Sequence, residues 1–288
     1  MYERLSKYFD NKLSKFQCGF RKGYSAQHCL AVMIEKWRKV LDKGGSFGVL
    51  LTDLSKTFDC LPHDLLIAKL HSYGLNRISL ELLLNYLTKR KQRVRIGRSF
   101  SEWQEILTGV PQGSILGPLL FNIYLCDLFL VLEGTDIASY ADDNSPYSCN
   151  KTIEAVSADL EGVAKVIFNW CIENGMKANS EKSHVILSRS SNLDLTIGDS
   201  IVTSSECQKL LGVYIDMNLT FDTHVSNLCN KASQKLHALA RVAPYMSLFQ
   251  RRIVMKSFFC SQFGYCPLVW MFHSKKLNNR INNLQEVS

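Results

Sequence analysis

Two acidic blocks, far apart in the chain, hold the residues best suited to metal-dependent chemistry. The first ends a short apolar run, Phe47 to Leu51, with Asp53, and the second is the adjacent pair Asp142 and Asp143. A buried strand that ends in an aspartate delivers a carboxylate into a cleft, whereas two adjacent carboxylates repel unless a cation offsets them. A solvated Asp-Asp turn is the commoner fate of such a pair. Together, however, the three carboxylates supply the hard oxygen donors that Mg²⁺ prefers.

The second acidic block is predicted to lie at the tip of a β-hairpin. Residues 134–139 indicate a turn and a short strand, and we expect Asn144-Ser145-Pro146 to turn the chain before a second strand, residues 147–149. Because adjacent strand residues point to opposite sides, Asp142 and Asp143 cannot be equivalent. Two ions about 3.5–4 Å apart at such a site activate an attacking hydroxyl and stabilise a leaving pyrophosphate.

Three blocks in this order resemble the successive motifs of a reverse transcriptase. They are residues 51–59 (LTDLSKTFD), 109–118 (GVPQGSILGP) and 140–143 (YADD). The residues of these motifs are most similar to those of the non-LTR, LINE-type and jockey-like retrotransposon enzymes. The similarity runs from about residue 11 to the end. The resemblance implies an α+β right-hand polymerase, with a palm of antiparallel sheet backed by helices, partial fingers and a helical thumb.

The resemblance also divides the chain into the parts of such a polymerase. We expect partial fingers over 1–45, a palm with inserted fingers helices over 46–205, a primer-grip hairpin over 206–220, and a truncated helical thumb or connection over 221–288. In the family, more fingers sequence precedes the segment Gln17 to Arg21 than is present here. The chain therefore resembles a copy truncated at its N-terminus.

The catalytic and triphosphate-binding residues follow from the same resemblance. Asp53, Asp142 and Asp143 would be catalytic and hold Mg²⁺ or Mn²⁺, with Asp142 the firmer ligand beside Asp53. Arg21 would face the incoming triphosphate, since a guanidinium donates to phosphate oxygens in a fixed fork. The alternative for Arg21 is a surface arginine in a basic loop.

Further residues of this family position the nucleotide. Phe58 would lie under the sugar and exclude a 2′-hydroxyl, although buried aromatics are more often plain core residues. Asp59 either binds metal or caps the turn that follows. Gln112 and Gly113 would position the substrate, because an amide donates and accepts at once and glycine allows a close approach of the backbone.

A lysine that protonates the leaving pyrophosphate is also expected in this family. Lys182 is the candidate and Lys177 the alternative, and a solvated surface lysine explains either residue equally well. Leu211 and Gly212, in a segment that resembles the primer grip, are expected to contact nucleic acid.

The densest positive run, residues 89–98, has two interpretations. As a strand it would carry Lys91, Arg93 and Arg95 on one face and Val94 and Ile96 on the other. Such a strand is either a solvated edge protected by its charge or a surface that tracks the phosphates of template or primer.

Periodic apolar positions and turn residues predict the remaining elements. They are a helix capped by Ser25 and stopped by Gly44-Gly45, two helices over 62–87 separated by Gly74, helices over 119–132 and 150–175, a hairpin turning at Gly198-Asp199, and helices from Phe221 onward.

Composition excludes several classes of protein. The 288 residues are 46% hydrophobic, which supports a core, and 34 Lys and Arg against 26 acids give a charge of +8 that suits a polyanionic partner. Ten cysteines without a Cys-x-x-Cys pair indicate neither a zinc site nor a disulfide framework, and fit a reducing compartment. No signal peptide is evident, and polar residues interrupt the most apolar stretch, 115–132. We expect an intracellular protein, nuclear or cytoplasmic, that spans no membrane.

The sequence therefore predicts an RNA-directed DNA polymerase that adds deoxynucleotides to a primer 3′-hydroxyl. Its partners would be an RNA template, a DNA primer and deoxynucleoside triphosphates. One alternative is an inactive truncated copy that keeps the fold and only binds nucleic acid. Another is an unrelated Mg²⁺-dependent phosphohydrolase, which leaves the Pro-Gln-Gly loop and Phe58 unexplained.

Overall fold

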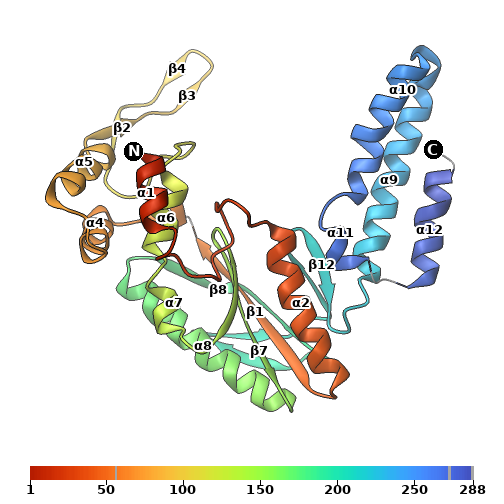
Figure 1. Cartoon of the computed structure of the whole chain (residues 1–288), viewed down its shortest axis with the longest axis horizontal. Helices are drawn as coiled ribbons and strands as arrows, with labels where there is room; N and C mark the ends of the chain where they lie inside the picture. Colours follow the sequence, from red (N-terminus) through yellow and green to blue (C-terminus); the bar gives the residue numbers. More distant parts are fainter. Residues whose placement is uncertain (56, 272–273, 287–288) are drawn as a thin grey trace.

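A four-stranded antiparallel sheet lies at the centre of the protein (Figure 1). The structure, a computed structural model, describes residues 1–55, 57–271 and 274–286, without the side chains of residues 53, 55, 276 and 284–286. The strand order is β6-β7-β1-β8. The strands are β1 (Ser46–Ser55), β6 (Asp136–Tyr140), β7 (Asp143–Asn150) and β8 (Lys177–Leu187).

One helix covers each face of this sheet. Phe47 and Val49 of β1 join the core beneath α2 (Ala26–Asp42), whereas Leu50 joins the core beneath α8 (Ile153–Glu173). This alternation follows from the two-residue period of a strand. A Cβ on Gly48 would lie 2.6 Å from the Val156 side chain, so this glycine allows the close approach of α8.

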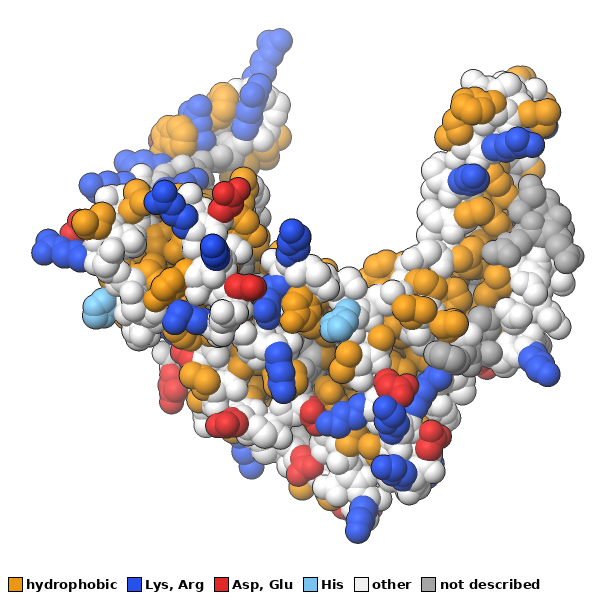
Figure 2. Space-filling model, in the orientation of Figure 1, with side chains coloured by type: hydrophobic (Ala, Val, Ile, Leu, Met, Phe, Trp, Pro, Cys, Tyr) orange, Lys and Arg blue, Asp and Glu red, His pale blue; other side chains and the backbone are white. Residues whose placement is uncertain are grey.

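The other elements form two arms on either side of the sheet (Figure 1). The first arm contains α1 (Tyr2–Phe9), α4 (His63–Ser72), α5 (Arg77–Leu87) and the strands β2 (Arg90–Gln92), β3 (Arg95–Ile96), β4 (Ser99–Phe100) and β5 (Gln104–Ile106). The second contains α9 (Asp222–Val242), α10 (Leu248–Val254), α11 (Pro267–Trp270) and α12 (Lys275–Glu286). Figure 2 shows a broad hollow between the arms, with Lys and Arg side chains gathered on the first.

Short elements complete the chain. They are α3 (Thr57–Cys60), α6 (Gly117–Tyr124), α7 (Leu128–Val131), the hairpins β9 (Asp194–Ile197) with β10 (Ser200–Thr203) and β11 (Cys207–Leu210) with β12 (Val213–Asp216), the 3₁₀ turns 243–245 and 260–263, and a π-helical turn at 255–259. No helix within the described residues is long and apolar enough to cross a membrane.

Most predicted helices are confirmed. Ser25 caps α2 by accepting a hydrogen bond from the amide of His28, and α4 and α5 are separated at Gly74. The helix expected over 150–175 exists but begins at Ile153, because β7 continues to Asn150. Trp37 is fully buried and stacks on Phe47, as expected of a core residue.

The single helix expected over 119–132 is wrong, since α6 ends at Tyr124 and α7 begins at Leu128. The break contains Asp127, whose carboxylate accepts hydrogen bonds from Lys69 and from the indole of Trp170. Tertiary partners of a polar residue therefore interrupt an apolar run that is locally helical.

The turn expected at Asn144-Ser145-Pro146 is also wrong. The chain turns at Ala141 and Asp142, and these three residues belong to β7, with Pro146 opposite Ile137 of β6. Pairing of β7 with β1 is interrupted between Val49–Tyr147 and Thr52–Asn144. Proline has no amide hydrogen to donate, so the gap lets a central strand contain one.

The continuous strand expected over 89–98 is broken into β2 and β3. All residues from 89 to 105 are exposed, including Val94 and Ile96, so no apolar face is buried. A two-residue gap separates the pieces because each pairs with its own partner, β2 with β5 and β3 with β4.

A buried histidine lies where the second arm meets the sheet. The Nδ1 of His224 accepts a hydrogen bond from the Tyr214 amide at 3.3 Å, and Nε2 has no partner among the described residues. Burial lowers the pKa of His224 to about 4, and the positive charge of Lys231 adds to the effect. The neutral form is therefore the one that fits the folded chain.

Acid is expected to destabilise the fold through this residue. As the pH falls from 6.5 towards 4, His224 binds a proton in the unfolded chain but stays neutral in the folded chain. The loss of stability is up to about 1.4 kcal/mol per pH unit. His224→Gln should weaken this loss in urea unfolding compared at about pH 7 and about pH 5. The control His71→Gln, at an exposed position, should retain it. Equal acid sensitivity in all three proteins would contradict the assignment.

Candidate active site

The register of two strand pairs brings the acidic blocks together. Thr52 of β1 pairs with Asn144 of β7, and Tyr140 of β6 pairs with Asp143. Because β1 and β7 are antiparallel, the next residue along β1, Asp53, comes opposite Asp143. The Thr52 hydroxyl donates to the Asn144 carbonyl at 2.7 Å, which holds the register at this point.

The tip of the hairpin presents its carboxylates to solvent. Asp142 and Asp143 are both exposed, and Ala141 occupies the tight turn with a φ of +60°, where a non-glycine residue is strained. The side chain of Asp53 lies outside the described residues. Among the side chains that are described, no group of three or more His, Cys, Asp or Glu could hold a metal ion. Carboxylates at these three backbone positions are nevertheless a donor set that fits Mg²⁺ or Mn²⁺.

The residue after the acidic pair contributes to the turn. Asn144 is buried, and its Nδ2 donates to the carbonyl of Asp142 at 3.3 Å. Its Oδ1 has no hydrogen-bond partner among the described residues.

An N-terminal segment extends the sheet beside the hairpin. The amide of Cys18 donates to the carbonyl of Ser139 at 2.8 Å, the amide of Ser139 donates to Phe16, and a parallel bridge joins Gln17 to Ser139. Gly19 follows directly. A Cβ on Gly19 would lie 2.1 Å from the backbone nitrogen of Ala141, so only glycine fits against the turn.

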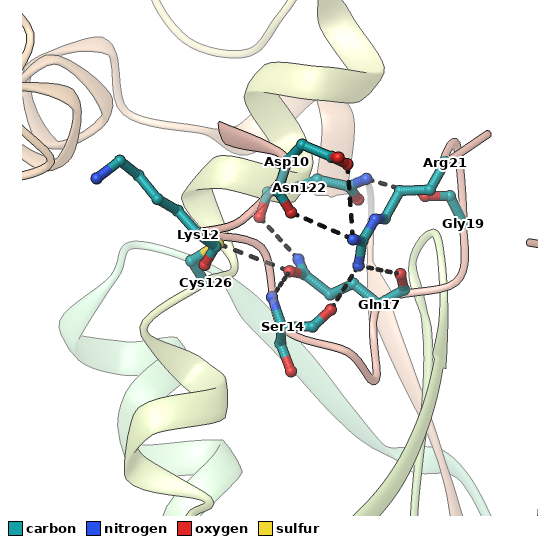
Figure 3. Close-up of polar contacts among 8 residues, drawn as sticks. All are labelled: Asp10, Lys12, Ser14, Gln17, Gly19, Arg21, Asn122 and Cys126. Atoms are coloured by element: carbon teal, nitrogen blue, oxygen red, sulfur yellow. Dashed lines mark hydrogen bonds and ion pairs between the residues drawn. The ribbon is translucent and has the colours of Figure 1, made fainter. Parts of the chain in front are cut away.

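Gln17 joins this segment to α6, as Figure 3 shows. Its Nε2 donates to the carbonyl of Asn122 at 2.7 Å, and the Nδ2 of Asn122 donates back to the carbonyl of Gly19 at 2.9 Å. Both side chains are buried, and the Gln17 Oε1 accepts from the amide of Ser14. The sequence missed the roles of Gln17, Gly19 and Asn122, although the first two lie in the segment quoted for its resemblance to the fingers.

Arg21 is held inside the same loop and is not a solvated surface residue. Its guanidinium donates to the carbonyls of Ser14 at 2.7 Å and Gln17 at 3.2 Å, and forms an ion pair with Asp10 at 3.9 Å (Figure 3). Only 12% of its side chain is exposed. The guanidinium also lies over the ring of Tyr24. These bonds organise residues 10–17, and contact with a triphosphate remains a prediction.

Phe58 is half-buried between two aromatic rings. It stacks on Phe121 of α6, with 4.4 Å between ring centroids, and meets Phe20 edge to face at 5.9 Å. The three rings are contributed by the Asp53 block, the N-terminal segment and α6. Such packing fixes the position of the ring, and its role at the sugar remains a prediction.

The Pro-Gln-Gly loop packs on the turn that contains Phe58. The amide of Val110 donates to the carbonyl of Phe58 at 2.8 Å. Gln112 is exposed and donates from Nε2 to the Oδ1 of Asp59 at 2.9 Å. Gly113 has a φ of +78° and open space around the position of a Cβ. The loop is thus beside the Asp53 block, and its contact with substrate remains a prediction.

The candidate lysines lie on β8. Leu51 pairs with His184 whereas Asp53 pairs with Asn179, so residues 180–183 form a bulge that contains Lys182. Lys177 pairs with Ser55 at the start of the strand. Both lysines are exposed. A role for Lys182 or Lys177 in protonating pyrophosphate remains a prediction.

The remaining candidates lie in the hairpin of residues 89–106, which belongs to the first arm, and in the Leu211-Gly212 turn between β11 and β12. The guanidinium of Arg93 lies 4.0 Å from the centroid of Phe100 and 4.6 Å from that of Trp103. The hydroxyl of Tyr265 donates to the carbonyl of Leu211 at 2.7 Å, and burial raises the pKa of Tyr265 to about 12. The expected hairpin at 206–220 is therefore present, and contact with nucleic acid remains a prediction at both places.

Comparison with known proteins shows which family contains these motifs. The family described as reverse transcriptase (RNA-dependent DNA polymerase) matches residues 1–215. In Drosophila melanogaster, the chain is 28% identical to a probable RNA-directed DNA polymerase from transposon BS, over 95% of this chain and 32% of that protein. It is 25% identical to the RNA-directed DNA polymerase from mobile element jockey, over 95% of this chain and 31% of that protein. The chain thus spans about a third of the length of these curated relatives.

Solved structures share the fold at low sequence identity. The apo telomerase of Candida tropicalis truncated from its C-terminal domain aligns with a TM-score of 0.53 and 13% identity, over 75% of this chain and 44% of that one. The telomerase of Candida albicans in complex with a fragment of telomeric RNA aligns with a TM-score of 0.50 and 14% identity, over 99% and 51%. The expected right-hand α+β polymerase fold is confirmed. The chain belongs to the reverse transcriptase family, and over 95% of its length it resembles the enzymes of non-LTR retrotransposons.

Proposed function

We propose that this chain binds an RNA template and a DNA primer and adds deoxynucleotides to the primer 3′-hydroxyl. The observation that carries the proposal is the strand register, which brings the backbone of Asp53 opposite Asp143 at the tip of the β6–β7 hairpin. Membership of the reverse transcriptase family supplies the reaction type. The ten cysteines, all free, fit activity inside the cell, in the nucleus or cytoplasm.

Asp53, Asp142 and Asp143 would hold the divalent cations, Mg²⁺ or Mn²⁺. When bound, such ions lower the barrier for attack by the primer hydroxyl and neutralise charge on the leaving pyrophosphate. The turn with Ala141 at positive φ, held by Asn144 and Gly19, keeps the carboxylates of 142 and 143 exposed to solvent.

The remaining candidates would act on the incoming nucleotide. Phe58 would limit the space at the sugar, and its stacking on Phe121 supports a fixed position for the ring. Gln112 and Gly113 would contact the nucleotide from the adjoining loop. Arg21 and Lys182 stay candidates for the phosphates, the first through a rearrangement of its present bonds.

We further propose that residues 1–45, with α4, α5 and the positive hairpin, act as fingers and residues 221–288 as a thumb. The two arms that border one hollow in Figure 2 support this division for α1, α4, α5 and the hairpin on one side and for α9 to α12 on the other, whereas α2 packs on the sheet. Leu211 and Gly212 would act as the primer grip at the base of the thumb. Here Tyr265 fixes the turn, and a Cβ on Gly212 would come within 3.0 Å of its ring.

The positive hairpin, residues 89–106, is proposed to follow template phosphates. It contains six Lys and Arg against two Glu. Lys91 lies 3.6 Å from Glu105, whereas Arg93 and Arg95 contact aromatic rings and keep their charge exposed. Arginine stacked on an aromatic ring is suited to single-stranded nucleic acid, which offers phosphates and bases together.

Removing these charges is expected to weaken RNA binding in a salt-dependent way. A plot of log affinity against log salt has a negative slope. In Arg93→Gln and Arg95→Gln this slope should become shallower by about one for each phosphate that the hairpin no longer neutralises. Fluorescence anisotropy with a labelled RNA at several salt concentrations measures the slope. The control is Lys151→Gln, an exposed lysine just beyond the opposite end of β7 from Asp143. Equal slopes in all four proteins would exclude the hairpin from the interface.

Primer extension on an RNA template tests the proposed function. The wild-type chain, with a labelled DNA primer, deoxynucleotides and Mg²⁺, should lengthen the primer, and a chelator should stop the reaction. RNA binding without extension would identify a copy that keeps only the fold. Phosphate release without a primer would instead identify a phosphohydrolase.

A further inference from the structure

The turn after β1 and the Pro-Gln-Gly loop are joined along their whole contact. The amide of Gly109 donates to the carbonyl of Leu61 at 2.7 Å, and the hydroxyl of Thr108 donates to the carbonyl of Asp59 at 2.8 Å. The Nε2 of His63, which is buried, lies 2.7 Å from the carbonyl of Gly109. A Cβ on Gly109 would lie 2.7 Å from backbone atoms of Asp59. These contacts therefore fix the position of the loop relative to the turn.

One side-chain bond between the loop and the turn reaches the residue expected to contact substrate. The Nε2 of Gln112 donates to the Oδ1 of Asp59 at 2.9 Å, and both side chains are exposed. They line a cavity of about 840 Å³ whose wall also contains Arg90 and Lys91. The polymerase function proposed above gives Asp59 no role.

The chemistry of the two partners fixes the direction of the amide. An ionised carboxylate only accepts hydrogen bonds, so Gln112 must turn its NH₂ group towards Asp59. Its Oε1 is then left as an acceptor for another donor. Without Asp59, the amide could rotate by half a turn and present NH₂ in place of the oxygen.

We propose that Asp59 is a positioning residue that orients Gln112, so that its Oε1 accepts a hydrogen bond from a hydroxyl or N–H group of the incoming nucleotide. The proposal rests on the proposed polymerase function and deepens it. It distinguishes Asp59 from the metal-binding carboxylates, because its Oδ1 is engaged by an amide of the neighbouring loop.

A donor–acceptor exchange tests the orientation. Asp59→Asn lets the amide of residue 59 either accept from or donate to Gln112, so the direction of Gln112 is no longer fixed. KM for the deoxynucleotide should rise by about 3- to 10-fold with kcat within about twofold. Gln112→Glu should raise KM more, about 10- to 50-fold, because two carboxylates then face each other. In the double variant, the amide of residue 59 again donates across the pair and leaves a carboxylate oxygen towards the nucleotide. KM should return to within about threefold of wild type.

Thr108→Val is the matched control. It removes the hydrogen bond to the backbone carbonyl of Asp59 without changing the Asp59–Gln112 pair. It should lower the melting temperature and leave KM unchanged. Asp59→Asn should instead leave the melting temperature unchanged and raise KM. An unchanged KM in Asp59→Asn, or a double variant no better than Gln112→Glu, would overturn the proposal.

Side-chain amide NMR separates this inference from the polymerase function. The ¹⁵N-bound protons of Gln112, assigned by their loss in Gln112→Ala, should shift in Asp59→Asn with no substrate present. If the wild-type chain extends no primer, the proposed function fails, and these resonances still decide whether Asp59 orients Gln112. Identical resonances in the two proteins would refute the orienting bond.

Discussion

Asp142→Asn is expected to lower the rate of primer extension by at least about 100-fold while the protein stays folded. Loss of one carboxylate removes several kcal/mol of stabilisation from the proposed two-metal site, and each 1.4 kcal/mol is about tenfold in rate. Asp143→Asn should have a smaller effect, because Asp142 is expected to be the firmer ligand. Single-turnover extension on an RNA template, with circular dichroism to check folding, gives both quantities.

The control for this prediction is another aspartate at a hairpin tip. Asp199 lies in the exposed turn between β9 and β10, and Asp199→Asn should extend primers at the wild-type rate. RNA binding should be unchanged or slightly tighter in Asp142→Asn, since a negative charge is removed from the hollow. Extension by Asp142→Asn within a few-fold of wild type would exclude the residue from the metal site.

Gly19→Ala is expected to be the most damaging substitution outside the carboxylates. The added methyl group would lie 2.1 Å from the nitrogen of Ala141 and 2.9 Å from its Cα, both backbone atoms that cannot rotate away. Overpacking of this kind costs about 1–3 kcal/mol of stability. The added methyl group would overlap the backbone of Ala141, directly before Asp142, and should displace the Asp142 carboxylate. A displacement of about 1 Å should also slow extension by about 100-fold.

Gly162→Ala provides the matched control for this change. Gly162 lies on the exposed side of α8 with nothing within 4 Å of a Cβ, so alanine should stabilise the helix by about 0.5–1 kcal/mol. Urea unfolding and primer extension of the two variants measure the contrast. If Gly19→Ala is as stable and as active as wild type, the segment is not packed against the hairpin as described.

Local patterns explain what could be predicted from the sequence. The order of the acidic blocks, the cap at Ser25 and the separation of α4 from α5 at Gly74 depend on residues close together in the chain. These are the levels at which periodicity and motif spacing carry information.

Contacts between distant segments explain what could not be predicted. The approach of Gly19 to Ala141 and the bond from Gln112 to Asp59 join parts of the chain whose own patterns show only loops. Pro146 indicated a turn, and only the interrupted ladder between β1 and β7 shows how a central strand accommodates it. The break before Leu128 likewise depends on Lys69, a residue on another helix.

The short bridge between Gln17 and Ser139 has a consequence for solubility. β6 is the outer strand of the sheet, and its unpaired amides and carbonyls would otherwise be open to a strand of another molecule. Residues 16–18 occupy part of that border with their own backbone. A version of this chain shortened past Gly19 would leave the border bare beside the acidic turn, and self-association by β-pairing would compete with the binding of a primer.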